Sequence, residues 1–181
     1  MASSNQRTYA VLVLGAVALA AMFALRRPLE DTAAKSPAAP TLWRATVEGC
    51  PEQSREEAEA LAAERLRLAV AKHERSPFHP EDGVAAIPLY EAAAACFRKA
   101  ARNAEADEAA ADARQLKQQL EDEFRAHSLR LQRALALENW KWAERESAVL
   151  SAFVTGGGTE YADWLSNLRR KIQLSYGSAP P

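Results

Sequence analysis

Alanines and leucines recur at intervals of three and four residues over most of the chain beyond Ala58. That spacing places them on one face of an α-helix, and about 40 of the 181 residues are alanine, a strong helix former. Alanine carries little apolar area, so the core of this protein must depend on close contacts between helices. The pattern predicts an all-α fold of antiparallel helical hairpins over residues 46–175.

The first predicted helix begins at a capping motif. Ser54 and Glu57 in "SREE" fit a capping box, in which the serine oxygen and the glutamate carboxylate satisfy two backbone N–H groups. We expect this helix to reach about Glu74. The stretch "SPFHPEDG", residues 76–83, carries two prolines and a glycine and predicts a turn. Pro88 then falls in the first turns of the next helix, which it can bend.

A long helix is predicted next. Asn103 is the expected cap, and the apolar spacing continues from there to about Leu137. Because such a helix would exceed thirty residues, a break near His127 or Ser128 is the alternative.

Two shorter helices complete the predicted domain. Glu138 and Asn139 mark a tight turn into "WKWAERESAVLSAFV", and "TGGGT", residues 155–159, ends that helix. Thr159 is the expected cap of a last helix that runs to about Leu174. Residues 176–181 are expected to be a disordered tail.

The N-terminal region predicts attachment to a membrane. Residues 9–25 form an uncharged, apolar run that is long enough to cross a bilayer, after a short tail of residues 1–8. A cleaved signal peptide is one alternative, since Ala18-Leu19-Ala20 offers a cleavage pattern, and a buried helix of a soluble protein is another. Residues 26–45, rich in proline and alanine, predict a linker. Trp43 at its end would sit at lipid headgroups or pack on the folded domain.

Two features of the sequence predict opposite orientations of this segment in the membrane. The positive-inside rule favours a cytoplasmic C-terminal domain, because only Arg7 precedes the run whereas four basic residues follow it: Arg26, Arg27, Lys35 and Arg44. The short N-terminal tail and the cleavage pattern favour export. We expect a single-pass inner-membrane protein with a periplasmic rather than cytoplasmic helical domain. The excess of Arg over Lys, together with the many alanines, is typical of a bacterial protein.

The charges argue against nucleic-acid binding. The chain has 23 basic and 24 acidic residues, for a net charge of −1, and both signs are interspersed. No sustained positive field is therefore expected.

Motifs for catalysis, metals or cofactors are missing from the sequence. His73 and His79 lie in one acidic stretch, but a separation of six residues suits no common zinc motif, and His127 is isolated. The glycines at 156–158 lack the Lys-Ser/Thr of a phosphate-binding loop. We therefore expect no cofactor, no metal and no enzymatic activity.

Cys50 and Cys96 are the only cysteines. Their separation excludes C-x-x-C redox and haem-attachment patterns. They are either buried thiols or, if the domain is exported, a disulfide that ties the segment before the first helix to the second helix.

Two segments resemble the tetratricopeptide repeat family. Small, aromatic and small residues at Ala86, Tyr90 and Ala93 resemble the second helix of such a repeat, and Ala143, Ser147 and Leu150 resemble it more weakly. The two segments lie 57 residues apart, whereas the family repeats about every 34, so the resemblance implies irregular helical hairpins. It also implies scaffolding and partner binding in a concave groove.

The sequence thus predicts a membrane-anchored protein–protein interaction scaffold in a bacterial envelope assembly. Its candidate partner-binding residues are large aromatic side chains, which core packing would explain equally well: Tyr90, Phe97, Phe124, Trp140 and Trp142. The alternative function is a self-assembling structural subunit, a homo-oligomer held together by the alanine-rich helix from Asn103 to Leu137.

Overall fold

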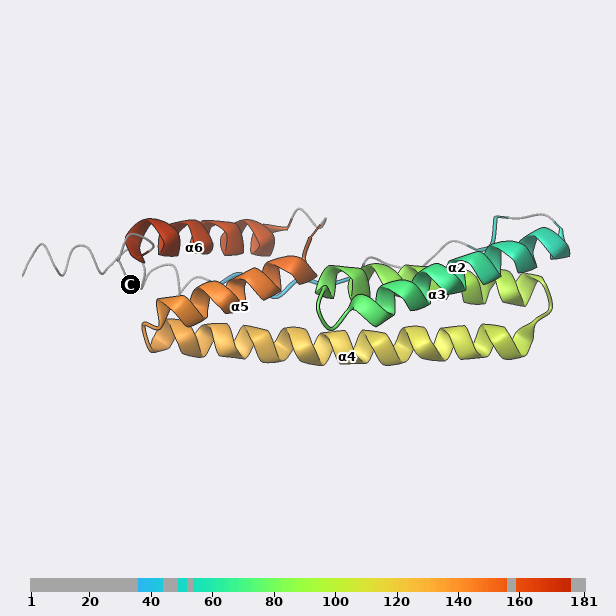
Figure 1. Cartoon of the computed structure of the whole chain (residues 1–181), viewed down its shortest axis with the longest axis horizontal. Helices are drawn as coiled ribbons and strands as arrows, with labels where there is room; N and C mark the ends of the chain where they lie inside the picture. Colours follow the sequence, from blue (N-terminus) through green and yellow to red (C-terminus); the bar gives the residue numbers. More distant parts are fainter. Residues whose placement is uncertain (1–35, 44–48, 52–53, 156–158, 177–181) are drawn as a thin grey trace, which may run out of the picture. The chain divides into compact units, whose positions relative to one another are not determined.

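The computed structural model describes residues 36–43, 49–51, 54–155 and 159–176. These residues form five α-helices and no strand, which confirms the all-α prediction (Figure 1). The helices are α2 (Arg55–Arg75), α3 (Pro80–Lys99), α4 (Asn103–Ala136), α5 (Trp140–Phe153) and α6 (Glu160–Tyr176). Contacts divide the chain after Pro37, and all five belong to the second unit, Ala38–Pro181.

The predicted membrane span at residues 9–25 lies outside the described residues, as do the tail at 1–8, most of the linker and the C-terminal residues 177–181. Among the helices that the structure describes, none combines the length and the apolarity needed to span a bilayer.

The predicted capping box starts α2. Ser54 Oγ accepts a hydrogen bond from the backbone N–H of Glu57 at 3.1 Å, and the Glu57 carboxylate accepts one from the backbone N–H of Ser54 at 3.3 Å. The side of α2 that faces the core buries only alanines, Ala58, Ala62 and Ala69. Because these side chains are small, a neighbouring helix can approach closely.

The connection between α2 and α3 is shorter than the sequence predicts. Only residues 76–79 separate the two helices, because Pro80 occupies the first turn of α3, where its missing N–H costs nothing. Gly83 is a buried helical residue rather than part of the turn. A Cβ atom there would lie 2.8 Å from Ser76 Cβ and 3.1 Å from a Leu120 methyl carbon, so glycine permits a close approach. The helix continues through Pro88, whose ring is exposed.

The long helix α4 is continuous from Asn103 to Ala136, so the alternative of a break near His127 or Ser128 is wrong. Asn103 is its first residue rather than its cap; Arg102 holds the cap position and makes no side-chain capping bond. Continuity follows from packing, because the buried stripe persists along the whole helix, from Ala106 to Leu135.

The last two helices start as predicted. Asn139 Oδ1 accepts from the backbone N–H of Trp142 at 3.1 Å at the start of α5, and Thr159 Oγ1 accepts from that of Ala162 at 3.2 Å at the start of α6. These bonds satisfy backbone donors that a helix start leaves unpaired.

Consecutive helices pack against one another, and α3 also contacts α5. Figure 1 shows α2 and α3 along the part of α4 nearer its start and α5 along the part nearer its end, with α6 beside α5. Small side chains dominate the first region, where Ala62, Ala93 and Ala106 join Phe97 in one cluster. Aromatic rings fill the second region, where Phe124 lies 5.7 Å from Phe153 and 5.8 Å from Tyr161 between ring centroids.

Candidate partner-binding surface

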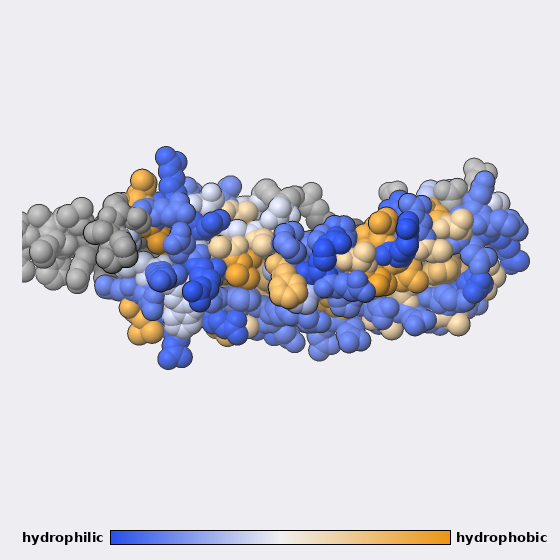
Figure 2. All heavy atoms as spheres, in the orientation of Figure 1, coloured by the Kyte–Doolittle hydropathy of each residue, from blue (hydrophilic) through white to orange (hydrophobic). Residues whose placement is uncertain are grey.

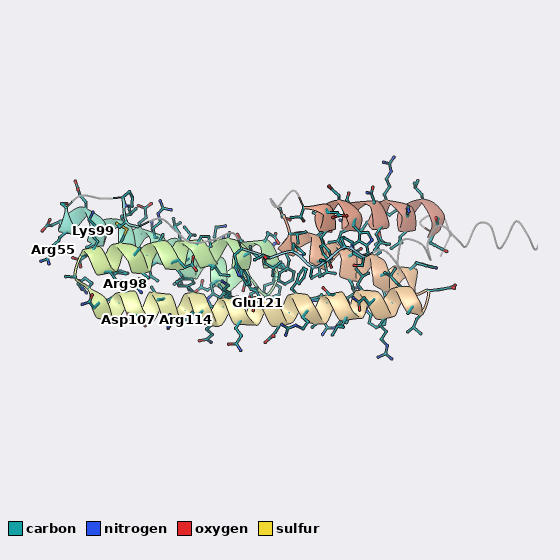
Figure 3. The ribbon with its side chains drawn as sticks, turned by 180° about the vertical axis from the view of Figure 1, so that it is seen from behind. Arg55, Arg98, Lys99, Asp107, Arg114 and Glu121 are labelled. Carbon is teal, nitrogen blue, oxygen red and sulfur yellow. A yellow bond between two sulfur atoms is a disulfide. The ribbon has the colours of Figure 1, made fainter. Side chains whose placement is uncertain are left out.

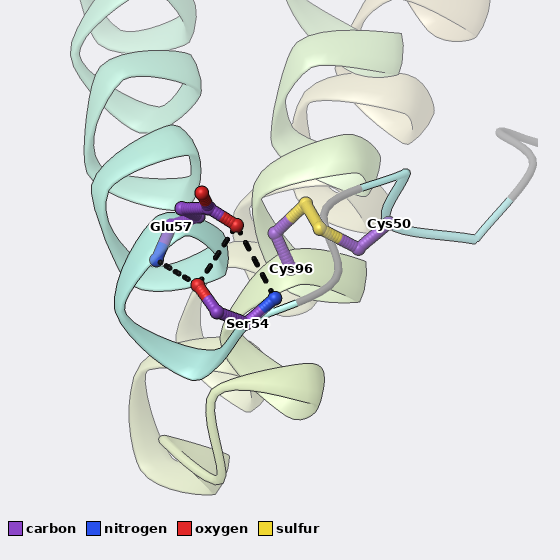
Figure 4. Close-up of a disulfide and its surroundings, with 4 residues drawn as sticks. All are labelled: Cys50, Ser54, Glu57 and Cys96. Carbon is purple, nitrogen blue, oxygen red and sulfur yellow. Dashed lines mark hydrogen bonds between the residues drawn. A yellow bond between two sulfur atoms is a disulfide. The ribbon is translucent and has the colours of Figure 1, made fainter.

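A disulfide joins Cys50 to Cys96 (Figure 4). It links the segment that precedes α2 to the last turn of α3, which is the second of the two alternatives for these cysteines, and Cys96 is buried at 2% exposure. The bond encloses α2 in a covalent loop, since Arg55–Arg75 lies between the two cysteines.

An open groove lies beside this disulfide. Its volume is about 330 Å³, and its walls come from α2, α3 and the segment before α2: Gly49, Cys50, Pro51, Leu61, Arg65, Ala92 and Cys96. We call it the disulfide groove. Figure 2 shows apolar side chains exposed between charged ones over α2 and α3. Among the lining residues that the structure describes, Arg65 is the one that carries a charge.

A second groove, of about 340 Å³, lies where residues 39–43 cross α4. We call these residues the strap. Trp43 is half-buried, and Lys117 Nζ lies 5.0 Å from the centre of its ring, in reach of a cation–π interaction. Leu42 of the strap and Phe124 of α4 both line this groove. Of the two expectations for Trp43, the structure therefore shows packing on the helical unit.

Three of the five predicted partner-binding aromatics lie in the interior. Tyr90 is 2% exposed, and Phe97 and Phe124 are each 6% exposed, so very little of each ring is open to a partner in this packing. The Tyr90 hydroxyl lies 3.2 Å from His73 Nδ1. Burial is the main cause that raises the pKa of Tyr90, with a smaller contribution from the carboxylates of Asp112 and Glu74.

The two tryptophans are half-exposed and engaged within the chain. Trp140 stacks on Tyr176 of α6, with ring centroids 4.8 Å apart. Trp142 Nε1 donates to the Glu146 carboxylate at 2.9 Å. Both rings thus have structural roles, and the structure does not bring the five aromatic candidates together into one surface.

Glu146 is a buried carboxylate that sequence reasoning missed. It is 6% exposed, and besides Trp142 it contacts His127 Nδ1 at 2.6 Å, so both of its oxygens have partners. A buried carboxylate requires such partners. Only the spacing of Trp142 and Glu146, four residues apart on one helix, signalled part of this network in the sequence.

The acidic stretch with two histidines forms ion pairs instead of a metal site. Asp82 accepts from Lys72 Nζ at 2.6 Å and from Arg75 Nε at 2.7 Å, while His79 contacts Glu81 at 3.3 Å. The hydrogen bonds from Arg75 and Lys72 lower the pKa of Asp82 from 3.8 to about 2. Within the part of the chain that the structure describes, no three His, Cys, Asp or Glu side chains gather as metal ligands.

Basic side chains gather at one end of the helical unit but are offset by acidic ones. Figure 3 shows Arg55, Arg98 and Lys99 where α2 begins and α3 ends. Arg102, beside them in the chain, forms ion pairs with Glu59 and Glu105. The mixture leaves no strongly charged face here, in keeping with the net charge of −1.

Compared with protein families, with curated proteins and with solved structures, the chain matches none.

Proposed function

We propose that this chain is a membrane-anchored protein–protein interaction scaffold of a bacterial envelope assembly. Residues 9–25 serve as the anchor, and the helical unit faces the periplasm, where it binds a protein partner. Its consecutive helices act as tetratricopeptide-like hairpins of irregular length.

The observation that carries this proposal is the disulfide groove. Disulfides persist in oxidising compartments such as the periplasm and are rare in the cytosol, so the bond between Cys50 and Cys96 supports export. The bond also holds Gly49 and Pro51 against α2 and α3, where they form one wall of an apolar recess. Open apolar recesses with few polar groups are typical binding sites.

The pairwise packing of consecutive helices supports the tetratricopeptide-like part of the proposal. Ala86, Tyr90 and Ala93, which carry the resemblance, are all buried on one side of α3. Small residues there allow neighbouring helices to approach, as that family requires.

Self-assembly through α4 is not part of the proposal. The large apolar residues that would form a coiled-coil seam are already buried inside the unit: Leu116, Leu120, Phe124 and Leu131. Sedimentation of the full chain in detergent checks this, since a monomer is expected and a stable oligomer would favour the alternative.

The test of the proposed function uses paired topology reporters. A periplasm-active and a cytoplasm-active enzyme are each fused after Pro181 in bacterial cells. We expect activity only from the periplasmic reporter, and resistance of both cysteines to alkylation until a reductant is added. Activity only from the cytoplasmic reporter, with both thiols freely alkylated, would contradict the proposal.

A further inference from the structure

Arg65 is an unusual member of the apolar stripe of α2. Its helical neighbours three and four residues away are all apolar: Leu61, Ala62, Leu68 and Ala69. Those positions are where a helical arginine finds a carboxylate to pair with. Arg65 is exposed and forms no ion pair with any residue that the structure describes.

Two cations farther along α2 differ from Arg65 in having a carboxylate partner. Lys72 lies two helical turns beyond Arg65, on the same side of α2, and it pairs with Asp82 at 2.6 Å. Arg75 pairs with the same carboxylate at 2.7 Å. Along this side of α2, Arg65 is therefore the cation that the described ion pairs leave unmatched, and it stands at the wall of an apolar recess.

From this arrangement we propose that the disulfide groove binds an acidic, amphipathic segment of a protein partner. An apolar side chain of that segment enters between Leu61, Ala92 and the disulfide, and an adjacent carboxylate pairs with Arg65. The inference rests on the proposed function and deepens it, because it names the surface and the chemistry of the partner.

Charge complementarity favours an acidic, amphipathic segment in the disulfide groove over a basic or a purely apolar one. A guanidinium beside an apolar wall forms charge-assisted, bidentate hydrogen bonds with a carboxylate, and these are stronger where water is excluded. A basic segment would bring a second cation against Arg65, and a purely apolar one would cover the guanidinium without pairing it, which is costly.

The test presents a random dodecapeptide library on phage to the full-length, oxidised chain purified in detergent. We expect selected peptides to combine apolar with acidic residues. A synthetic peptide of the consensus sequence should bind Arg65→Glu at least tenfold more weakly than the unaltered chain.

The matched control is Arg67→Glu. Arg67 lies on the same helix, about 200° around its axis from Arg65, and is likewise exposed. This variant should bind the peptide within about twofold of the unaltered chain. An equal loss in both variants would indicate a non-specific charge effect and overturn the inference. Ala92→Phe, which fills the groove without changing charge, should also abolish binding, provided that its circular dichroism spectrum is unchanged.

The outcomes separate the two proposals. Peptides that bind with equal affinity to the unaltered chain and to Arg65→Glu would overturn the assignment of the groove but leave a binding scaffold. Selection of basic peptides would overturn the charge argument. Failure to enrich any peptide would overturn the inference and count against the proposed function, whose topology is tested independently by the reporters.

Discussion

Ala101 and Glu138 adopt the same left-handed backbone conformation, with φ of 62° and 53°, in the turns on either side of α4. The surrounding hydrogen bonds are also the same. Arg102 N–H donates to the Phe97 carbonyl at 2.8 Å, and the N–H of Ala101 itself donates to Arg98. Asn139 and Glu138 make the equivalent bonds to Ala134 and Leu135. Both turns are Schellman motifs in which another residue replaces the usual glycine.

Glycine should therefore stabilise both turns. Ala101→Gly and Glu138→Gly relieve a Cβ clash that costs roughly 1–2 kcal/mol, so we expect each to raise the free energy of unfolding by ~0.5–1 kcal/mol after the entropy of glycine is counted. Urea denaturation followed by circular dichroism measures this. Ala100→Gly is the control, because Ala100 has φ of −74° and should lose stability instead. A lower free energy of unfolding in all three variants would disprove the Cβ clash as the explanation.

Gly83→Ala should destabilise the fold. The added methyl would lie 2.8 Å from Ser76 Cβ and within 3.2 Å of both Leu120 methyl carbons, and overpacking of this kind costs about 1–3 kcal/mol. Gly49→Ala is the matched control, since a methyl group added there would have no atom of a non-adjacent described residue within 4 Å. Thermal denaturation should show a lower midpoint for Gly83→Ala alone. Equal midpoints for the two variants would mean that α3 can shift to make room for the added methyl group.

Glu146→Ala should cost more stability than Glu144→Ala. The first change leaves the partly buried N–H groups of Trp142 and His127 without their acceptor, a loss of about 1–3 kcal/mol. The second removes only an exposed bond to Gln173, worth under about 0.5 kcal/mol. Chemical denaturation measures the free energy of unfolding of both variants. Similar losses of stability would show that the hydrogen bonds of Glu146 contribute little.

Asp82 should make stability depend on pH in the acidic range. Its pKa is lowered from 3.8 to about 2 by Arg75 and Lys72, so the folded state favours the carboxylate. The resulting stabilisation is present above about pH 4 and is lost as the pH falls through 2. Asp82→Asn should be less stable by ~1 kcal/mol at pH 5 and equal to the unaltered chain near pH 2. A difference that stays constant between these pH values would refute the ion-pair account.

Loss of the disulfide should lower stability by about 2–4 kcal/mol, because the bond closes a loop with a sequence separation of 46. Cys50→Ala is the suitable variant, since Cys50 is the more exposed partner. Adding dithiothreitol should reduce the stability of the unaltered chain to that of Cys50→Ala and leave the variant unchanged. Equal stability of the oxidised chain and the variant would show that packing alone holds the segment before α2.

Local signals were predictable from the sequence, because they depend on residues close together in the chain. The capping oxygens of Ser54 and Thr159 act within one helical turn. The periodicity of α4 likewise identified its buried stripe. The Cys50–Cys96 pairing remained one of two alternatives until the fold brought the two residues together.

Features that depend on distant neighbours were not predictable. Gly83 resembled a turn glycine, yet its role comes from Leu120, far along the chain. Nothing marked Ala101 as left-handed, because glycine is the usual signal there. Glu146 resembled a surface charge until His127 of the neighbouring helix completed its contacts. The aromatic candidates failed to form one surface for the same reason, since burial depends on tertiary packing.

The covalent loop around α2 also sets the path of mechanical load. A pull along the chain from Gly49 reaches Cys50 and passes through the sulfur atoms into Cys96, in the last turn of α3. The capping box at Ser54 lies beyond this branch point and is shielded from the tension. Tension applied from the N-terminal side would therefore act on the turn between α3 and α4 and would not separate α2 from its neighbouring helices.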